Sequence, residues 1–257
     1  MTFKDWLRMI SIGLRFACLG FVLWFLFGPM LFFALCAVGC VVFILKNKEY
    51  KASSYYQVTR LPYLLMQFDA GRYGEYMTYV ALKQFEALGA KFLFNVYIPK
   101  SDGGTTEIDV LMICSHGVFV FESKNFSGWI FGDERHKNWC QTLRGHRGKS
   151  RKEYFYNPIW QNQGHIKHLR ALIGDYAPHY SVVVFSNRCT LQDVNVESRE
   201  VCVIQRCDVC NTVSLLCSSN THNSLTSVDV QSLYAKLYPY SQVSAAEKKQ
   251  HVDDIYR

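Results

Sequence analysis

The stretch that decides the fold is residues 107–124, EIDVLMICSHGVFVFESK. Two runs rich in Val, Ile and Phe, 107–114 and 117–124, are separated only by Ser115 and His116, a spacing typical of a β-hairpin. The second run is apolar on both faces until its end, which predicts a central, buried strand. The stretch therefore predicts two neighbouring strands inside a sheet.

Three charged residues lie on the buried faces of these strands. Because side chains alternate along a strand, Asp109 shares a face with Leu111, and Glu122 shares a face with Lys124. Antiparallel pairing would bring Asp109, near the start of one strand, and Glu122, near the end of the other, to the same end of the sheet. Buried charges are costly unless they pair or bind a ligand.

Two interpretations of this charged group are open. Two converging carboxylates repel each other, and a divalent cation such as Mg²⁺ resolves the repulsion by binding both. A lysine beside the cation can orient or stabilise a water-derived nucleophile, an arrangement typical of phosphodiester hydrolysis. Alternatively, Glu122 and Lys124 form an ion pair within their strand and Asp109 caps a turn. The pattern of residues alone does not decide between them.

Helices and further strands are predicted on both sides of the hairpin. Before it, residues 71–88 predict a helix with one apolar stripe, and residues 91–99 alternate as a strand. After a loop-rich stretch, 125–157, in which 129–131 are a candidate short strand, Pro158 begins a helix that runs to about Gly174. The apolar stripe comprises Tyr73, Met77, Val80, Ala81, Gln84, Phe85 and Leu88. The remaining predicted elements are strands 181–185 and 201–204, helices 208–216 and 228–237, and a helical tail from Ala245. This order predicts an α/β domain with a mixed sheet.

The first 45 residues are interpreted as a membrane anchor. Residues 16–45 contain no charged residue, and as one helix they would be about 45 Å long, longer than a hydrocarbon core of about 30 Å is thick. The Gly28-Pro29 pair favours either one long helix kinked at Pro29 or a hairpin of two short spans, 12–27 and 30–45. Basic residues on both flanks favour the hairpin, which places both ends in the cytoplasm. These residues are Lys4, Arg8, Arg15, Lys46, Lys48 and Lys51.

Composition and cysteine content limit the remaining possibilities. With 49% apolar and 19% charged residues, the 257-residue chain is neither disordered nor dominated by linkers. Its ten scattered cysteines are expected to be reduced thiols, because the domain is expected in the cytoplasm. Cys207 and Cys210, with Cys202 and Cys217 nearby, suggest zinc. A structural zinc site normally needs two well-formed ligand pairs, so buried core cysteines are favoured.

A basic segment follows the hairpin. Residues 135–152 include seven Lys or Arg and no acidic residue, although the whole chain carries a net charge of only +7. The candidate contacts to nucleic acid are Arg144, Arg147, Lys149, Arg151 and Lys152. Positive charge near the carboxylates suits a phosphate backbone, and nearby aromatic residues can stack on unpaired bases. The alternatives are a solvated loop and a loop that lies on anionic lipid.

Several of these pieces, taken in order, resemble the nuclease-related domain (NERD), a branch of the PD-(D/E)xK nuclease superfamily. The matching pieces are Gly74-Glu75, Glu107-Ile108-Asp109, residues 117–125 with Gly128, Trp139, and Asn157-Pro158 with Gln161. They cover a little under half of the chain. The resemblance implies a restriction-endonuclease-like mixed sheet flanked by helices, here preceded by the predicted transmembrane helical hairpin.

The resemblance also implies a role for the matching polar residues. Asp109 and Glu122 would bind Mg²⁺ or Mn²⁺, and Lys124 would position or polarise the attacking water. Glu75 would be an acid of the first helix near the metal, and Gln161 a polar residue of a later helix facing the same site. Against the role of Glu75, successive steps of 100° place it roughly opposite the apolar stripe of its helix.

The sequence thus predicts a membrane-anchored, metal-dependent nuclease that hydrolyses phosphodiester bonds of nucleic acid, with DNA as the expected partner. It is expected in the plasma membrane (the bacterial inner membrane), with the domain on the cytoplasmic side. The alternative is a catalytically silent nucleic-acid-binding or membrane interaction module that retains the nuclease fold. The expected organisation is an anchor (1–45), a linker (46–70), the nuclease-related domain (71–188) and a C-terminal α/β extension with a helical tail (189–257).

Overall fold

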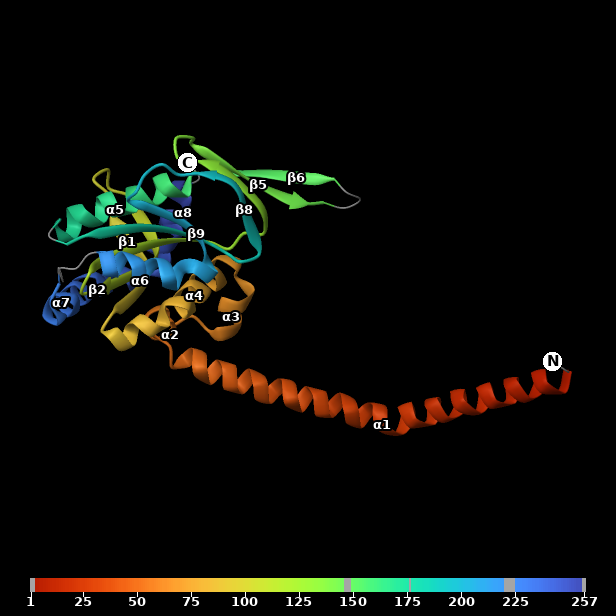
Figure 1. The fold of residues 1–257 in the computed structure, drawn as a ribbon. Helices are drawn as coiled ribbons and strands as arrows, with labels where there is room; N and C mark the ends of the chain where they lie inside the picture. Colours follow the sequence, from red (N-terminus) through yellow and green to blue (C-terminus); the bar gives the residue numbers. More distant parts are fainter. Residues whose placement is uncertain (1–2, 146–148, 176, 220–224, 256–257) are drawn as a thin grey trace. The chain divides into compact units, whose positions relative to one another are not determined.

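The structure is a computed structural model that describes residues 3–145, 149–175, 177–219 and 225–255 (Figure 1). The chain divides into two compact units, residues 1–52 and residues 53–257. The first unit consists of helix α1 (Phe3–Lys51), which is 49 residues long. Within α1, Met30–Lys51 is long and apolar enough to cross a membrane.

The N-terminal hairpin expected from the sequence is not found in the structure. Residues 12–27 and 30–45 belong to the same continuous helix, α1, which bends along its length (Figure 1). Pro29 is the only proline in α1. A proline removes one backbone hydrogen bond and crowds the preceding turn, which kinks a helix. Reversing the chain takes a loop of about two to five residues. The structure therefore agrees with the other interpretation, a single kinked helix.

The second unit is built around a five-stranded mixed sheet. In spatial order its strands are β1 (Lys91–Pro99), β2 (Thr105–Cys114), β3 (Gly117–Lys124), β7 (His179–Phe185) and β9 (Val201–Gln205). The pairs β1–β2 and β2–β3 are antiparallel, and β3–β7 and β7–β9 are parallel. The predicted fold class, a mixed sheet flanked by helices, is confirmed.

The β2–β3 hairpin has the predicted register. Val110 lies opposite Phe121, so the next positions along the two strands are Asp109 and Glu122. Residues that face each other across an antiparallel pair lie on the same side of the sheet. Asp109 and Glu122 therefore lie on one face and at one end of the sheet, as the alternation of side chains predicted.

Helices cover both faces of this sheet (Figure 1). On one face lies α5 (Pro158–Ile173), whose Asn162 side chain donates a 2.9 Å hydrogen bond to a backbone oxygen of β3. On the other face lies α4 (Ala70–Leu82), where the ring centroid of Tyr79 is 5.4 Å from that of Phe92 on β1. The further helices are α2 (Ser54–Thr59), α3 (Tyr63–Phe68), α6 (Val209–Ser219), α7 (Ser227–Leu237) and α8 (Ala245–Ile255). Short 3₁₀ helices are formed by Lys83–Leu88, Arg206–Asp208 and Tyr238–Ser241.

The buried face of α4 differs from the predicted apolar stripe. Two residues of that stripe, Val80 and Leu88, are 40% and 77% exposed. The pattern of hydropathy was misleading because the buried face includes polar groups that form hydrogen bonds. Thr78, for example, donates to the backbone oxygen of Gly74 at 3.0 Å and lies 3.1 Å from the hydroxyl of Ser123. The residues that α4 buries are Gly74, Glu75, Thr78, Tyr79 and Leu82.

A second sheet of four strands corrects the prediction of a loop-rich stretch at 125–157. In spatial order its strands are β6 (Ser150–Tyr156), β5 (Asn138–Arg144), β4 (Gly128–Asp133) and β8 (Cys189–Asn195). The strands β5 and β6 form an antiparallel hairpin. Because β6 is largely exposed and charged, it lacks the alternation of apolar and polar residues by which a strand is recognised in a sequence.

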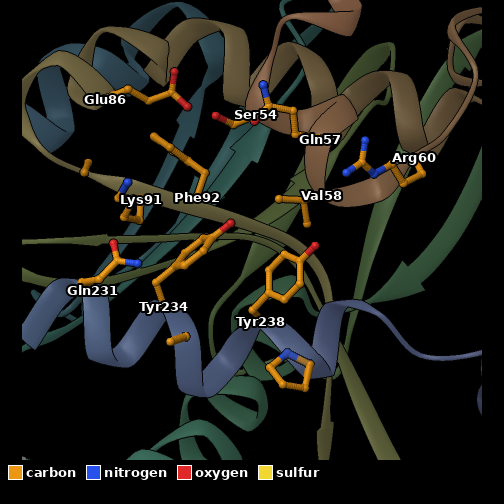
Figure 2. A pocket seen from close by; sticks show the side chains of 13 residues that line it. Ser54, Gln57, Val58, Arg60, Glu86, Lys91, Phe92, Gln231, Tyr234 and Tyr238 are labelled. Atoms are coloured by element: carbon orange, nitrogen blue, oxygen red, sulfur yellow. The ribbon is translucent and has the colours of Figure 1, made fainter.

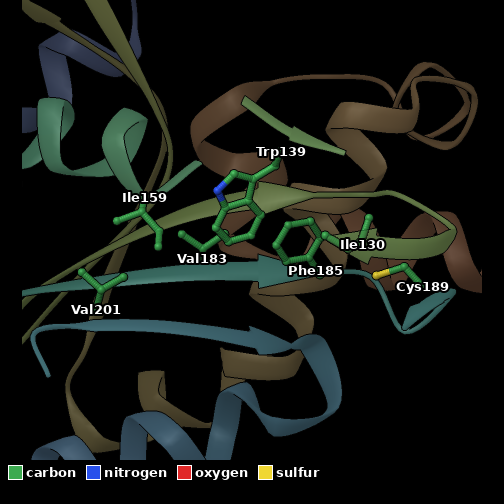
Figure 3. Close-up of a cluster of buried hydrophobic side chains, with 7 residues drawn as sticks. All are labelled: Ile130, Trp139, Ile159, Val183, Phe185, Cys189 and Val201. Atoms are coloured by element: carbon green, nitrogen blue, oxygen red, sulfur yellow. The ribbon is translucent and has the colours of Figure 1, made fainter. Parts of the chain in front are cut away.

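An apolar cluster joins the two sheets (Figure 3). Trp139 of β5 stacks on Phe185 of β7, with ring planes 3° apart and centroids 6.2 Å apart. Gly132 faces the indole ring, where a Cβ atom would lie only 2.1 Å from Cδ2 of Trp139. The buried residues of the cluster are Ile130, Trp139, Ile159, Val183, Phe185, Cys189 and Val201. Close packing around Trp139 therefore holds the second sheet against the first.

Two segments expected outside the nuclease-related domain contribute to the second unit. The predicted linker continues α1 to Lys51 and then forms α2 and α3 in the second unit, where Tyr55 of α2 is buried. The predicted C-terminal extension contributes β8 to one sheet and β9 to the other. The final helix, α8, contacts the main sheet through His251, whose Nδ1 lies 2.9 Å from the hydroxyl of Thr105. Residues from both segments thus lie in the same compact unit as residues 71–188.

Candidate active site

Glu122, near the end of β3, is a buried carboxylate with a partner for each oxygen. Only 1% of its surface is exposed. The Nζ atom of Lys124 lies 2.6 Å from Oε1, and Nε2 of His165 lies 3.2 Å from Oε2. Burial opposes the charge of Glu122, but the two partners outweigh burial, so the pKa of Glu122 is lowered. Glu122 is therefore ionised at neutral pH.

Lys124 is held between the strand and α5. Besides contacting Glu122, its Nζ atom donates a hydrogen bond of 3.1 Å to Oε1 of Gln161. Burial opposes the ammonium charge, but the carboxylates of Glu122 and Asp109 outweigh burial and raise the pKa of Lys124. Four of the five residues predicted to be catalytic, Asp109, Glu122, Lys124 and Gln161, are thus brought together.

Asp109 of β2 is in a different electrostatic situation. Its Oδ2 atom accepts a hydrogen bond of 2.8 Å from the backbone N–H of Ser123. Among the described residues Asp109 has no ion-pair partner, whereas Glu122 pairs with Lys124 and contacts the ring of His165. Burial, and then the negative charges of Glu122 and Glu75, raise the pKa of Asp109 well above its ordinary value. Without a cation, the surroundings of Asp109 therefore favour its protonated form.

The donor atoms and the charge of this group fit a hard divalent cation. Carboxylate oxygens are the protein ligands that Mg²⁺ and Mn²⁺ prefer. A cation would supply the positive charge that Asp109 lacks, and Glu122 provides a second carboxylate from the neighbouring strand. Because both oxygens of Glu122 have partners within the chain, coordination by Glu122 requires Lys124 or His165 to share an oxygen.

Glu75 reaches the middle of the fold because α4 approaches β3 closely at Gly74. A Cβ atom at Gly74 would lie 2.7 Å from Cβ of Asn125, well inside the separation of about 3.5–4.0 Å that carbon atoms prefer. Gly74 thus permits α4 to approach the end of β3, and the next residue, Glu75, is an acid that is only 6% exposed.

The hydrogen-bond partners of Glu75 come from α2, α4 and β1. Nη1 of Arg72 lies 3.2 Å from Oε1, while the hydroxyl of Tyr55 and Nδ2 of Asn95 donate to Oε2 at 3.2 and 2.7 Å. Burial is the largest influence and raises the pKa of Glu75 despite the nearby Arg72. The same Nη1 atom of Arg72 lies 3.2 Å from Oε1 of Glu107 on β2, so Arg72 bridges these two acids. Within the described part of the chain, no hydrogen bond or ion pair joins Glu75 to Asp109 or Glu122. Its influence on Asp109 is electrostatic.

Asn95 has an unusual backbone beside Asp109. Its φ angle is 51° in the middle of β1, in the left-handed region that residues other than glycine seldom adopt. The pairing of β1 with β2 is interrupted where Asn95 would face Asp109. Such conformations cost about 1–3 kcal/mol and cluster at functional sites. Through its bond to Glu75, Asn95 links α4 to the strand that lies next to Asp109.

Two residues that hold acids of this site were not predicted from the sequence: His165, which contacts Glu122, and Asn95, which contacts Glu75. Nδ1 of His165 lies 2.7 Å from the hydroxyl of Thr106, and Nε2 of the same ring contacts Glu122. His165 is therefore held between β2 and β3. One signal for it existed, because His165 follows Gln161 by four residues and so shares its face of the helix. Asn95 had no such signal, since a positive φ angle cannot be read from the residue type.

Asn157 fixes the start of the helix that carries Gln161. Its Oδ1 atom accepts a hydrogen bond of 2.9 Å from the backbone N–H of Ile159, which caps α5. Its Nδ2 atom donates to the backbone oxygens of Glu134 and His136 at 3.0 and 2.8 Å. Asn157 therefore supports the site by tying the β4–β5 turn to α5, at a distance from the carboxylates.

The basic residues predicted to contact nucleic acid lie on the β5–β6 hairpin, which extends away from the main sheet (Figure 1). Arg144, Lys149, Arg151 and Lys152 are exposed, and Arg147 lies outside the described residues. One of them, Arg151, pairs with Glu153 at 2.7 Å. The hairpin therefore presents a group of cations to solvent.

Exposed aromatic residues share the outer face of the second sheet with Lys152. Lys152 lies opposite Thr142 on β5, and Thr142 lies opposite Trp129 on β4, so all three occupy the same face. Tyr154 follows on that face because it is two residues further along β6. Trp129 and Tyr154 are 54% and 72% exposed. The face thus combines positive charge with rings that can stack.

A cavity of about 760 Å³ lies away from this site. It is lined by residues of α2, β1, α7 and the 3₁₀ helix after α7, among them Lys91, Tyr234 and Tyr238 (Figure 2). None of the five residues predicted to be catalytic contributes to its wall. This cavity is therefore separate from the carboxylate site.

Comparison with known proteins agrees with this geometry. The family model described as "Nuclease-related domain" (NERD) matches residues 70–186. An uncharacterized protein of Bacillus anthracis is 33% identical over 186 residues, which is 72% of this chain and 84% of the relative. No solved structure matches the chain. The family match spans helix α4 with Glu75, strands β2 and β3 with Asp109 and Glu122, and helix α5 with Gln161.

Proposed function

Because the chain belongs to the nuclease-related domain family, we propose that it is a metal-dependent nuclease that hydrolyses phosphodiester bonds of nucleic acid, with DNA as its substrate. The observation that carries this proposal is the buried Asp109 carboxylate, which has no ion-pair partner among the described residues. It lies on the strand next to the Glu122–Lys124 ion pair. A purely structural group of charges would neutralise itself. Here Asp109 pairs with no cation in the described part of the chain, and burial beside Glu122 and Glu75 raises its pKa, so a bound cation would take the place of its proton.

Asp109 and Glu122 would hold Mg²⁺ or Mn²⁺, which when bound polarises a phosphoryl oxygen and makes a bound water more acidic. Lys124, protonated and directed by Gln161, would stabilise the negative charge of the attacking water and of the phosphate. His165 would keep Glu122 in its orientation. Glu75, on α4, would raise the pKa of Asp109 through its negative charge and would not contact the substrate.

The β5–β6 hairpin would bind the nucleic-acid backbone. Its exposed cations provide attraction that does not depend on sequence, and Trp129 and Tyr154 can stack on bases where strands separate. The helix Met30–Lys51 would anchor the chain in the plasma membrane, the inner membrane if the organism is bacterial. Lys46, Lys48 and Lys51 at its end favour the cytoplasmic side for the nuclease domain, whereas Lys4, Arg8 and Arg15 at the other end of α1 oppose this orientation for a single crossing.

The proposed metal dependence has a direct test. The purified chain is expected to cleave DNA with Mn²⁺ or Mg²⁺ and to lose this activity when EDTA is added, because Asp109 would then lack its cation. Mn²⁺ should also raise the melting temperature, since a ligand that binds only the folded state stabilises it. Comparing the rates of cleavage of DNA and of RNA of the same sequence identifies the preferred substrate. Cleavage that persists in EDTA, or Mn²⁺ that changes neither activity nor melting, would refute the metal role.

The contribution of the hairpin is tested through salt dependence. Changing Arg144, Lys149, Arg151 and Lys152 to Gln is expected to weaken DNA binding at least ~10-fold at 0.1 M salt. The slope of log Kd against log salt should fall by up to about 0.9 for each phosphate group that the variant no longer neutralises. The matched control changes four exposed cations elsewhere, Lys83, Lys167, Arg199 and Lys249, to Gln. Equally weakened binding in both variants would show that only total charge matters.

One observation favours a second function, a catalytically silent nucleic-acid-binding module. Lys124 and His165 occupy both oxygens of Glu122, and in a silent module this arrangement would be permanent. Such a protein would bind DNA through the hairpin equally well with EDTA and with Mn²⁺, and it would cleave in neither. The cleavage assay above therefore separates the two functions.

A further inference from the structure

Three metal-ligating side chains that the proposed nuclease function does not use meet at the other end of the β2–β3 hairpin. They are Cys114 at the end of β2, His116 in the turn, and Cys217 on α6. One ligand atom from each lies within 4.8 Å of the other two. We propose that these residues form a binding site for a thiophilic transition-metal ion, with Zn²⁺ as the expected occupant.

The spacing of the three side chains suits a tetrahedral ion. Zinc binds thiolate sulfur at about 2.3 Å and imidazole nitrogen at about 2.0–2.1 Å, so ligands at tetrahedral corners lie roughly 3.6–3.8 Å apart. Ligand atoms already within 4.8 Å reach this spacing through small side-chain rotations. Two thiolates and one imidazole leave a fourth position for water, as in zinc sites with three protein ligands.

Hydrogen bonds in the β2–β3 turn and the burial of Cys114 support the two ligands that the hairpin provides. The Ser115 hydroxyl lies 3.2 Å from Nδ1 of His116, and the backbone oxygen of Ser115 accepts a hydrogen bond of 3.0 Å from the N–H of Leu225. Contacts of this kind orient metal-ligating histidines in known sites. Cys114 is buried at the end of a central strand. The chain therefore presents the ligands from ordered elements.

This site differs in chemistry and in place from the carboxylates. Thiolate and imidazole select zinc or copper over magnesium, whereas Asp109 and Glu122 offer hard oxygen ligands. Five residues of β2 separate Asp109 from Cys114, a distance of about 17 Å at about 3.4 Å per residue. A metal at the cysteines would connect α6 to the β2–β3 hairpin and would not contact the proposed substrate.

The test uses the reduced, purified chain and the metals alone. One Zn²⁺ per chain should bind tightly, and Co²⁺ in its place should give the thiolate-to-metal absorption and visible bands of tetrahedral cobalt. Cys217→Ser is expected to lower the affinity for zinc about 100-fold or more. Cys207→Ser, an exposed cysteine near the start of α6, is the matched control and should bind like the parent. Asp109→Asn should also keep the cobalt spectrum, which separates this site from the nuclease proposal.

A second readout does not depend on any variant. Zinc should protect Cys114 and Cys217 of the unmodified chain from alkylation, as measured by mass spectrometry of peptides, while Cys207 reacts at the same rate with and without metal. Absence of the cobalt absorption together with unprotected thiols would overturn the proposal. So would a disulfide between Cys114 and Cys217 in the protein as isolated from the cell.

Discussion

Asp109→Asn is expected to reduce metal-dependent cleavage by at least about 10³-fold without destabilising the fold. The activity falls because the amide carries no charge to hold the cation, and a factor of about 10³ corresponds to roughly 4 kcal/mol less transition-state stabilisation. The fold should survive because asparagine has the shape of aspartate, and its oxygen can still accept the bond from the Ser123 N–H.

The effect on stability has a predictable sign. The pKa of Asp109 in the folded chain lies above its unfolded value, so the folded state holds this proton more tightly than the unfolded state does. Between the two pKa values, rising pH therefore removes stability from the parent chain. Asp109→Asn abolishes that dependence. At pH 7 without metal, we expect the variant to be at least as stable as the parent and less sensitive to pH.

Added Mn²⁺ should reverse the order of stability. Mn²⁺ should raise the melting temperature of the parent but not of Asp109→Asn, because only the parent binds the ion through this carboxylate. Asp102→Asn, which changes an exposed acid in the β1–β2 turn, is the matched control and should cleave and melt like the parent. An Asp109→Asn variant that cleaves at the parent rate would remove Asp109 from the mechanism.

Glu122→Gln is a poorer test of catalysis. Lys124 and His165 both lose their ionised partner in this variant. Removing one member of a buried ion pair costs about 3–5 kcal/mol, since the other charge is left buried and unpaired. Reduced cleavage in Glu122→Gln would therefore mix a catalytic effect with a structural one, which Asp109→Asn avoids.

Trp139→Ala is expected to lower the free energy of unfolding by about 3–5 kcal/mol. Trp139 is 1% exposed, stacks on Phe185 and donates from Nε1 to the backbone oxygen of Asp133 at 3.0 Å. Truncation would leave a cavity where the two sheets meet, and Gly132 has no side chain with which to fill it. For a domain of this size, the melting temperature should fall by roughly 10 °C.

The matched control for Trp139 lies in the same sheet. Trp129→Ala removes the same side chain from the exposed outer face and is expected to change stability by less than about 1 kcal/mol. Urea unfolding followed by far-ultraviolet circular dichroism measures both variants without relying on tryptophan fluorescence. Equal destabilisation would mean that the cluster in Figure 3 does not hold the sheets together. Trp129→Ala should instead weaken binding to single-stranded DNA, which would fit stacking on its outer face.

Local patterns predicted much of the main sheet and failed where polar groups are buried or strands are exposed. Strand 91–99 and the hairpin at 107–124 follow from alternation and a short turn. The buried face of α4 does not, because hydrogen bonds offset the burial of Glu75 and Thr78. Strand β6 lacks alternation because most of its residues are exposed, and β5 was not recognised because it buries polar residues, Gln141 and Thr142. The candidate zinc ligands come from two distant segments, so no spacing in the sequence reveals them.

By itself, the sequence determined which two acids face each other. A side-chain period of two and a two-residue connection leave one register for Asp109 and Glu122, because neighbours in a hairpin meet through local geometry. Only the tertiary structure decided which partner each charge receives. Gln161 and His165 arrive on α5, and Glu75 turns to Asn95, through contacts between segments tens of residues apart. Such contacts form only when helices pack on the sheet, so they depend on the packing of the whole domain and not on the order of nearby residues.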